Sequence, residues 1–196
     1  MCGQFALNPV DYDTRTQVGV DQGSFKLSGS PRIYPTDTIA VIHQQQGRIQ
    51  CSGLRWGLDT EFLSRPVINA RSETVAEKPL FRTALAGFRC LLPMSAWFEW
   101  RKEGVSKVGY RFEPQALMNV AGIAWPPSSE RPQGAVVMLT TAAEGSVSHY
   151  HHRMPLILPA QQAQAWLQAP DVPAASLPDL TISPMDKNQP YQANLF

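Results

Sequence analysis

The sequence predicts an α+β fold, in which a curved, barrel-like and mostly antiparallel β-sheet is accompanied by a few short helices. Most apolar runs are short and are separated by turn-forming residues, as expected for strands. Stretches with the composition of a helix are scarce. The 196 residues contain no internal repeat, low-complexity tract or linker, so we expect a single domain over residues 1–196.

The predicted strands begin with a hairpin, because a Gly-containing turn separates Thr38–Gln44 from Arg48–Gly57. Residues Phe88–Trp100 are predicted to form one or two strands with a break near Pro93. The remaining predicted strands are Tyr110–Phe112, Met118–Trp125, Ala135–Thr141, Met154–Leu158 and Leu180–Met185.

Two helices are predicted. A short one is expected within Thr74–Ala86. The clearer one covers Pro159–Gln168, where a proline in the first turn precedes good helix formers. Residues Ala169–Pro178 are rich in proline and alanine and are predicted to form a loop.

The composition argues against several classes of protein. With 43% hydrophobic and 17% charged residues, the chain resembles a soluble globular protein. No apolar stretch approaches the roughly 20 residues of a membrane span, and the N-terminus lacks a signal-peptide pattern. The three cysteines include no CxxC pair, which argues against a disulfide scaffold and a zinc site. We expect a cytoplasmic protein, monomeric and without membrane contact, metal or cofactor.

Positive charge gathers in the middle of the chain. The net charge is only +1, but residues 48–111 hold eleven Lys or Arg against six Asp or Glu. This excess is either an unevenly charged solvated face or a surface that binds phosphate groups.

The chain begins MCG, which places a cysteine directly after the initiator methionine. Removal of Met1 would leave Cys2 with a free α-amine of pKa about 8 beside a thiol of pKa about 8.5. Both nucleophiles would be partly available near neutral pH. The alternative is a buried cysteine in a first strand, since cysteine is among the most buried residue types.

Two polar residues stand where their neighbours predict burial. Asn69 follows two β-branched residues and is either a turn or cap residue or an amide that holds a nucleophile or a substrate oxygen. Glu99 lies between two aromatic residues. It either faces water in an alternating strand or is desolvated, which raises the pKa of its carboxyl and prepares it to donate a proton. Strict alternation puts Trp97 and Glu99 on one face, which favours the buried orientation.

Three of the four histidines fall within Ser148–Pro155, SHYHHRMP. No matching cluster of ligands occurs elsewhere, so a metal site is disfavoured. The segment is either an exposed polar turn or the source of a histidine that exchanges protons near neutral pH. The adjacent Arg153 could hold a phosphate through two hydrogen bonds.

The chain resembles the SOS-response-associated peptidase (SRAP) family in four motifs: MCGQFA, INARSET, FRCLLPMSAWFEW and HHRMPLIL. Their order and spacing match the family along nearly the whole chain. The resemblance implies a single α+β domain around a curved sheet, with a positively charged groove for single-stranded DNA.

The resemblance also implies a reaction. Members of the family capture abasic sites in single-stranded DNA, where ring-opened deoxyribose exposes an aldehyde. After removal of Met1, the amine and thiol of Cys2 would close a thiazolidine ring on this aldehyde. Asn69 would position Cys2 and the sugar. Glu99 would move protons during ring opening and imine formation, and His151 would assist at the sugar oxygen.

Four further residues are expected to contact DNA. By resemblance, Arg71 and Arg153 would grip phosphates near the lesion, and Arg82 is expected to contact the DNA as well. Trp56 would wedge against a base, since base–aromatic stacking contributes roughly 1–3 kcal/mol.

Two departures from the family bear on DNA affinity. Gln4 stands where many members have Arg, and Arg32–Pro35 (RIYP) is a reduced form of the family's Tyr-Asn-x-Ala-Pro segment. Two other functions also fit the chain: an N-terminal-nucleophile peptidase or amidohydrolase that uses Cys2, and a DNA-binding module without chemistry. A stable DNA adduct would favour the crosslinking protein, and turnover of peptides or amides would favour the hydrolase.

Overall fold

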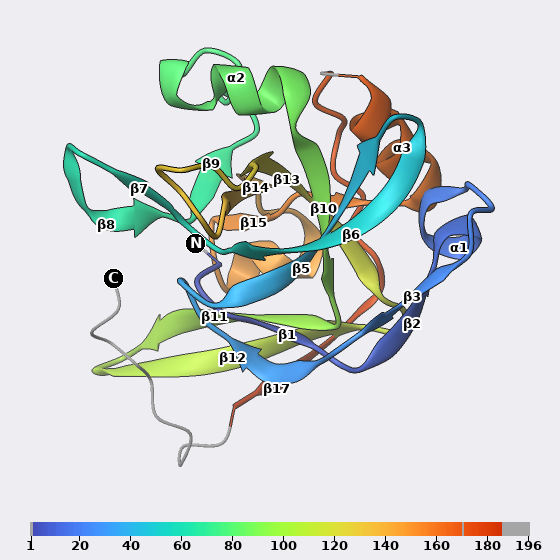
Figure 1. The fold of residues 1–196 in the computed structure, drawn as a ribbon. Coiled ribbons are helices and arrows are strands. Elements are labelled where there is room, and N and C mark those ends of the chain that lie inside the picture. Colours follow the sequence, from blue (N-terminus) through green and yellow to red (C-terminus); the bar gives the residue numbers. More distant parts are fainter. Residues whose placement is uncertain (1, 170, 186–196) are drawn as a thin grey trace.

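Two curved sheets face each other in the computed structural model, which describes residues 2–169 and 171–185 (Figure 1). The smaller sheet lies below the larger one in this view, and its five strands pair antiparallel. In spatial order it contains β17 (Leu180–Pro184), β12 (Ser106–Pro114), β11 (Ala96–Glu103), β1 (Phe5–Leu7) and β4 (Ser30–Ile33).

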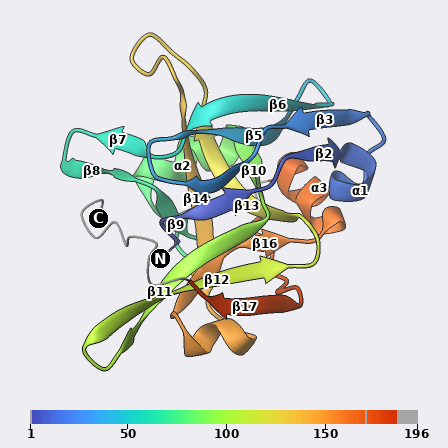
Figure 2. The same cartoon turned by 90° about the horizontal axis from the view of Figure 1, so that it is seen from below.

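The larger sheet carries the long central strands. Its main path is β15 (Arg153–Pro155), β14 (Ala135–Ala142), β13 (Met118–Trp125), β10 (Arg89–Met94), β5 (Thr38–Gln45) and β6 (Arg48–Arg55). Beside this path, β16 (Ile157–Leu158) pairs with β13, and β9 (Asn69–Arg71) runs parallel to β14. Both sheets curl without closing into a barrel (Figures 1 and 2), which confirms the predicted α+β class.

Helices and two small hairpins surround the sheets. The helices are α1 (Thr14–Val18), α2 (Pro79–Gly87) and α3 (Ala160–Gln168), with a 3₁₀ turn η1 (Gly145–His149). The hairpins are β2 (Val10–Asp13) with β3 (Ser24–Leu27), and β7 (Leu58–Thr60) with β8 (Leu63–Val67). Trp166 anchors α3, because its indole N–H donates to the carbonyl of Cys90 on β10 at 2.9 Å. No helix among the described residues has the length and apolarity needed to span a bilayer.

Most of the predicted strands are confirmed. The hairpin of β5 and β6 turns through Gln46 and Gly47, whose φ angles of 51° and 78° suit the left-handed turn that two-residue hairpins prefer. The strand predicted over Met118–Trp125 has those bounds in the structure. Helix α3 begins at Ala160, with Pro159 as its N-cap, and α2 covers only the second half of Thr74–Ala86.

The break predicted near Pro93 within Phe88–Trp100 is confirmed and falls at Ser95, so Pro93 itself lies inside β10. Proline fits there because β5 pairs only with Cys90 and Leu91, so among the described residues β13 is the only strand that pairs with β10 at Pro93. The strand predicted over Met154–Leu158 is two strands, β15 and β16, because they pair with different neighbours, β14 and β13.

The core fills the space between the two sheets. Trp97, Phe112 and Phe5 are among its largest buried side chains, and Trp97 stacks on Phe112 with ring centroids 4.9 Å apart. Cys2 is part of the same cluster. The N-terminal residues therefore enter the core at one end of the space between the sheets.

Candidate active site

The predicted site residues come from four separate segments. Cys2 precedes β1, Glu99 lies on β11, Asn69 begins β9, and His151 stands between η1 and β15. β1 and β11 are neighbours in the smaller sheet, whereas β9 and β15 flank β14 in the larger one. The site is therefore assembled across the space between the two sheets.

Cys2 is fully buried. Its thiol lies 3.5 Å from the carbonyl oxygen of Gln4, close enough for a weak S–H donor. Burial raises the pKa of the Cys2 thiol well above its usual range, and the nearby charge of Glu99 raises it further. In this environment the thiol stays protonated at neutral pH.

Asn69 holds the backbone of Cys2 in place. The side-chain Nδ2 of Asn69 donates to the carbonyl oxygen of Cys2 at 2.8 Å, across 67 positions of sequence. The side-chain Oδ1 of Asn69 is buried and accepts no hydrogen bond within residues 2–169 and 171–185. A buried acceptor of this kind is available to an amine or hydroxyl of a substrate complex.

Glu99 is buried on the same face of β11 as Trp97. Desolvation raises the pKa of the Glu99 carboxyl to about 7. The sequence-based expectation of a buried, proton-holding carboxyl is therefore consistent with its position. Near neutral pH this side chain populates both its acidic and its basic form.

His151 approaches Glu99 from the other sheet. Its Nε2 lies 3.9 Å from the Oε2 of Glu99, which is within ion-pair range but too long for a direct hydrogen bond. Desolvation lowers the pKa of His151 to about 4. At neutral pH the ring is therefore uncharged, whereas the sequence alone suggested a histidine that titrates near pH 7.

The backbone of Arg153 contacts the Nδ1 of His151. Both the backbone nitrogen and the carbonyl oxygen of Arg153 lie 3.0 Å from the Nδ1 of His151. The amide N–H can only donate and points away from β14, because Ala142 and Arg153 are a non-hydrogen-bonded pair of that ladder. We assign Nδ1 as the acceptor of this N–H, which places the ring proton on Nε2, the nitrogen nearer Glu99.

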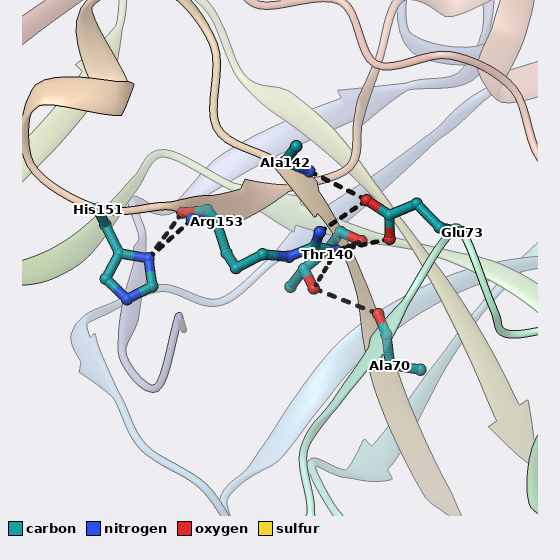
Figure 3. Close-up of polar contacts among 6 residues, drawn as sticks. All are labelled: Ala70, Glu73, Thr140, Ala142, His151 and Arg153. Carbon is teal, nitrogen blue, oxygen red and sulfur yellow. Dashed lines mark hydrogen bonds and ion pairs between the residues drawn. The ribbon is translucent and has the colours of Figure 1, made fainter.

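Two of the residues predicted to contact DNA are engaged inside the protein. The Trp56 side chain is fully buried, packs edge-to-face on Phe5 and donates to the carbonyl of Ile68 at 3.1 Å. It presents no ring face to a base in this structure, because its large apolar surface is part of the core. The guanidinium of Arg153 pairs with the carboxylate of Glu73 at 2.6 and 2.9 Å (Figure 3).

Other candidates for DNA contact lie on the surface. Arg71, at the end of β9, and Arg82, on α2, are both exposed. The tip of the β7–β8 hairpin exposes Phe62, whose relative accessibility is 73%. Sequence reasoning missed Phe62, although an aromatic residue in a polar turn is a recognisable signal. It also gave no role to Glu73, which belongs to the INARSET motif.

The described residues contain no group of three His, Cys, Asp or Glu side chains arranged to hold a metal ion. The polar groups that do converge surround the second residue of the chain. Fold and site together define a β-rich domain whose candidate reactive group is its own N-terminal cysteine.

The chain belongs to the SOS response associated peptidase family, and the match extends over residues 1–193. It is 31% identical to the abasic site processing protein YoaM of Bacillus subtilis over 179 residues, 85% of this chain and 79% of that one. It is 25% identical to the abasic site processing protein YedK of Escherichia coli over 177 residues, 86% and 80% of the two chains.

Solved structures share the fold. A phage-related protein from Bordetella bronchiseptica superposes with a TM-score of 0.77 at 23% identity and covers 94% of both chains. A protein from Bacteroides thetaiotaomicron, also 23% identical, gives a TM-score of 0.66 over 82% of this chain and 80% of that one.

Proposed function

We propose that this protein processes abasic sites in single-stranded DNA by forming a covalent thiazolidine crosslink through Cys2 after Met1 is removed. The single observation that carries this proposal is the hydrogen bond from Asn69 to the carbonyl of Cys2, beside a buried carboxyl and a neutral imidazole. The relatives named as abasic site processing proteins support the same substrate.

The chemistry condenses one aldehyde with one aminothiol and releases one water. The α-amine of Cys2 adds to C1′ of the ring-opened sugar, and loss of water gives an imine. The thiol sulfur then bonds to the same carbon, and its proton passes to the imine nitrogen. Because burial keeps the thiol protonated, the amine reacts first.

Glu99 is suited to carry the protons of these steps. In its acidic form it protonates O4′ as the sugar ring opens, and in its basic form it accepts a proton from the attacking amine. A pKa of about 7 leaves both forms populated at neutral pH. His151 contributes the Nε2 proton of a neutral ring, which can hydrogen-bond the sugar oxygen without adding charge.

DNA contacts are assigned to exposed groups. Arg71 and Arg82 are proposed to bind phosphates, since both are exposed cations near β9 and α2. Phe62 replaces Trp56 as the aromatic residue proposed to stack on a base. Arg153 would reach a phosphate only through the N–H groups that Glu73 and Thr140 leave unused.

Intact mass measurements on the protein with abasic single-stranded DNA test this function. Wild-type protein should lack Met1 and gain the mass of the DNA less one water. Cys2→Ala should form only an imine that borohydride traps, because the amine remains but no second nucleophile can close the ring. A stable adduct of Cys2→Ala without borohydride would exclude the thiazolidine, and turnover of peptides without any DNA adduct would favour the N-terminal-nucleophile hydrolase.

A further inference from the structure

The Glu73–Arg153 ion pair joins two segments that lie 80 positions apart in the sequence. Both carboxylate oxygens of Glu73 accept from the guanidinium, in the two-pronged geometry of the strongest such pairs. Oε1 of Glu73 also accepts from the backbone N–H of Ala142 at 3.2 Å. Figure 3 shows the guanidinium reaching across Thr140 toward Glu73.

The pair crosses β14 and connects the strands on its two sides. β9 carries Asn69 and pairs with β14 over three residues, and β15 pairs with the other edge of β14 over three residues. The carbonyl of Thr140 accepts from Ser72 N–H at 2.8 Å and from Arg153 Nη2 at 2.5 Å. β9 carries Asn69, and β15 follows His151. Both segments therefore contact β14 at the carbonyl of Thr140.

The pair also dictates where Arg153 lies. Its side chain is only 9% exposed, and a buried guanidinium without a counter-charge is strongly destabilising. Glu73 supplies that charge and thereby keeps Arg153 at the start of β15. The backbone N–H of Arg153 then lies 3.0 Å from Nδ1 of His151.

We infer that Glu73 is a positioning residue for the reaction. Through Arg153 it holds His151 with the ring proton on Nε2 and directed at Glu99. The expected effect of Glu73 on the crosslinking rate rests on the proposed function. Its expected effect on the tautomer of the His151 ring does not, because that is measured without DNA.

A cycle of variants measures the connection. Glu73→Gln keeps the size of the side chain but removes the charge, so we expect crosslinking at saturating DNA to slow about tenfold. In a His151→Ala background, Glu73→Gln should cause no further slowing, because the group through which it acts is gone. Glu77→Gln is the control, since it makes the same charge change on an exposed carboxyl of the same segment.

Equal slowing by Glu73→Gln in both backgrounds would overturn the inference, because a general structural defect does not require His151. Should Glu73→Gln fail to fold, Arg153→Lys gives the same cycle, since lysine keeps the charge but cannot form the two-pronged pair.

Nitrogen NMR of the His151 ring provides the second readout. Wild-type protein should show an unprotonated Nδ1 and a protonated Nε2 at neutral pH, and Glu73→Gln should show a mixture of tautomers. Identical ring spectra in the two proteins would overturn the inference even if crosslinking is slowed. If wild-type protein forms no DNA adduct, the proposed function fails, and the ring spectra still decide the role of Glu73.

Discussion

Replacing Glu99 by glutamine should stabilise the protein above neutral pH while it removes the proposed proton carrier. The folded-state pKa of Glu99 is about 7, compared with an ordinary value of 4.5. Between these values the folded protein binds more protons than the unfolded chain, so the stability of the wild type falls as pH rises. The penalty reaches its full size above pH 7, where the buried carboxyl is charged.

The expected size follows from the shift. Each pKa unit corresponds to about 1.4 kcal/mol, so raising the pKa of Glu99 from 4.5 to about 7 costs the wild type roughly 3–4 kcal/mol at high pH. Glu99→Gln has no such penalty. Relative to wild type, its free energy of unfolding should therefore rise by roughly 2–3 kcal/mol between pH 5 and pH 8.

Urea unfolding of both proteins at pH 5, 6, 7 and 8 measures this difference. The lowered pKa of His151 gives stability a contribution of opposite slope below pH 6.5, so the Glu99→Gln difference below that pH also includes the interaction between Glu99 and His151. Glu77→Gln, on the surface, should change the free energy of unfolding by less than about 0.5 kcal/mol. A Glu99→Gln difference that does not vary with pH would refute the burial argument.

Three further predictions concern the reaction and the DNA. His151→Ala should slow adduct formation or its reversal by about 10²–10⁴, whereas His149→Ala should remain near wild type. Crosslinking rates at several pH values compare the two variants, and a slower His149→Ala would show that His151 is not the histidine of the motif. Phe62→Ala should weaken binding to intact single-stranded DNA by about 1–3 kcal/mol in fluorescence anisotropy without lowering thermal stability. Arg71→Ala should lower the affinity for DNA and reduce the salt dependence of binding by about one phosphate contact, and an unchanged salt slope would show that Arg71 does not contact the DNA. The wild-type protein should bind single strands in preference to blunt duplex.

The long strands were predictable because their residue types and spacing carry the signal. β5, β6 and β13 each have eight residues, enough for runs of β-formers bounded by turns. The three-residue strands β9 and β15 are too short for any periodicity. They exist because they pair with the edges of β14, and such long-range pairing is not written in local sequence.

The residues of the candidate site stand out in the sequence for a different reason. Cys2, Asn69 and Glu99 are polar or reactive side chains within apolar stretches, and burying a polar group costs free energy unless a partner compensates it. The structure brings Asn69 to Cys2 and His151 toward Glu99, as the predicted roles require. That assembly depends on which strands become neighbours, so the sequence indicated the residues but not their contacts.

Two side chains expected to contact DNA, Trp56 and Arg153, have partners within the protein that lie far away in the sequence. Trp56 was assigned to a base, but the carbonyl of Ile68 satisfies its N–H and lets the ring enter the core. Arg153 was assigned to a phosphate, but Glu73 provides an anion within the fold. A long polar side chain can be assigned to a ligand only after the protein's own partners are known.

Burial shifts the pKa of three groups in the candidate site toward their neutral forms. It raises the pKa of the Cys2 thiol, raises that of Glu99 to about 7 and lowers that of His151 to about 4, so each shift favours the neutral form. A thiolate in this site would be costly, and a protonated imidazole would be costly as well. The proposed condensation joins an amine and a carbonyl and releases water, and the burial of Cys2 and Glu99 would shield that step from solvent. The same burial that lowers the stability of the folded protein therefore suits a condensation between neutral partners.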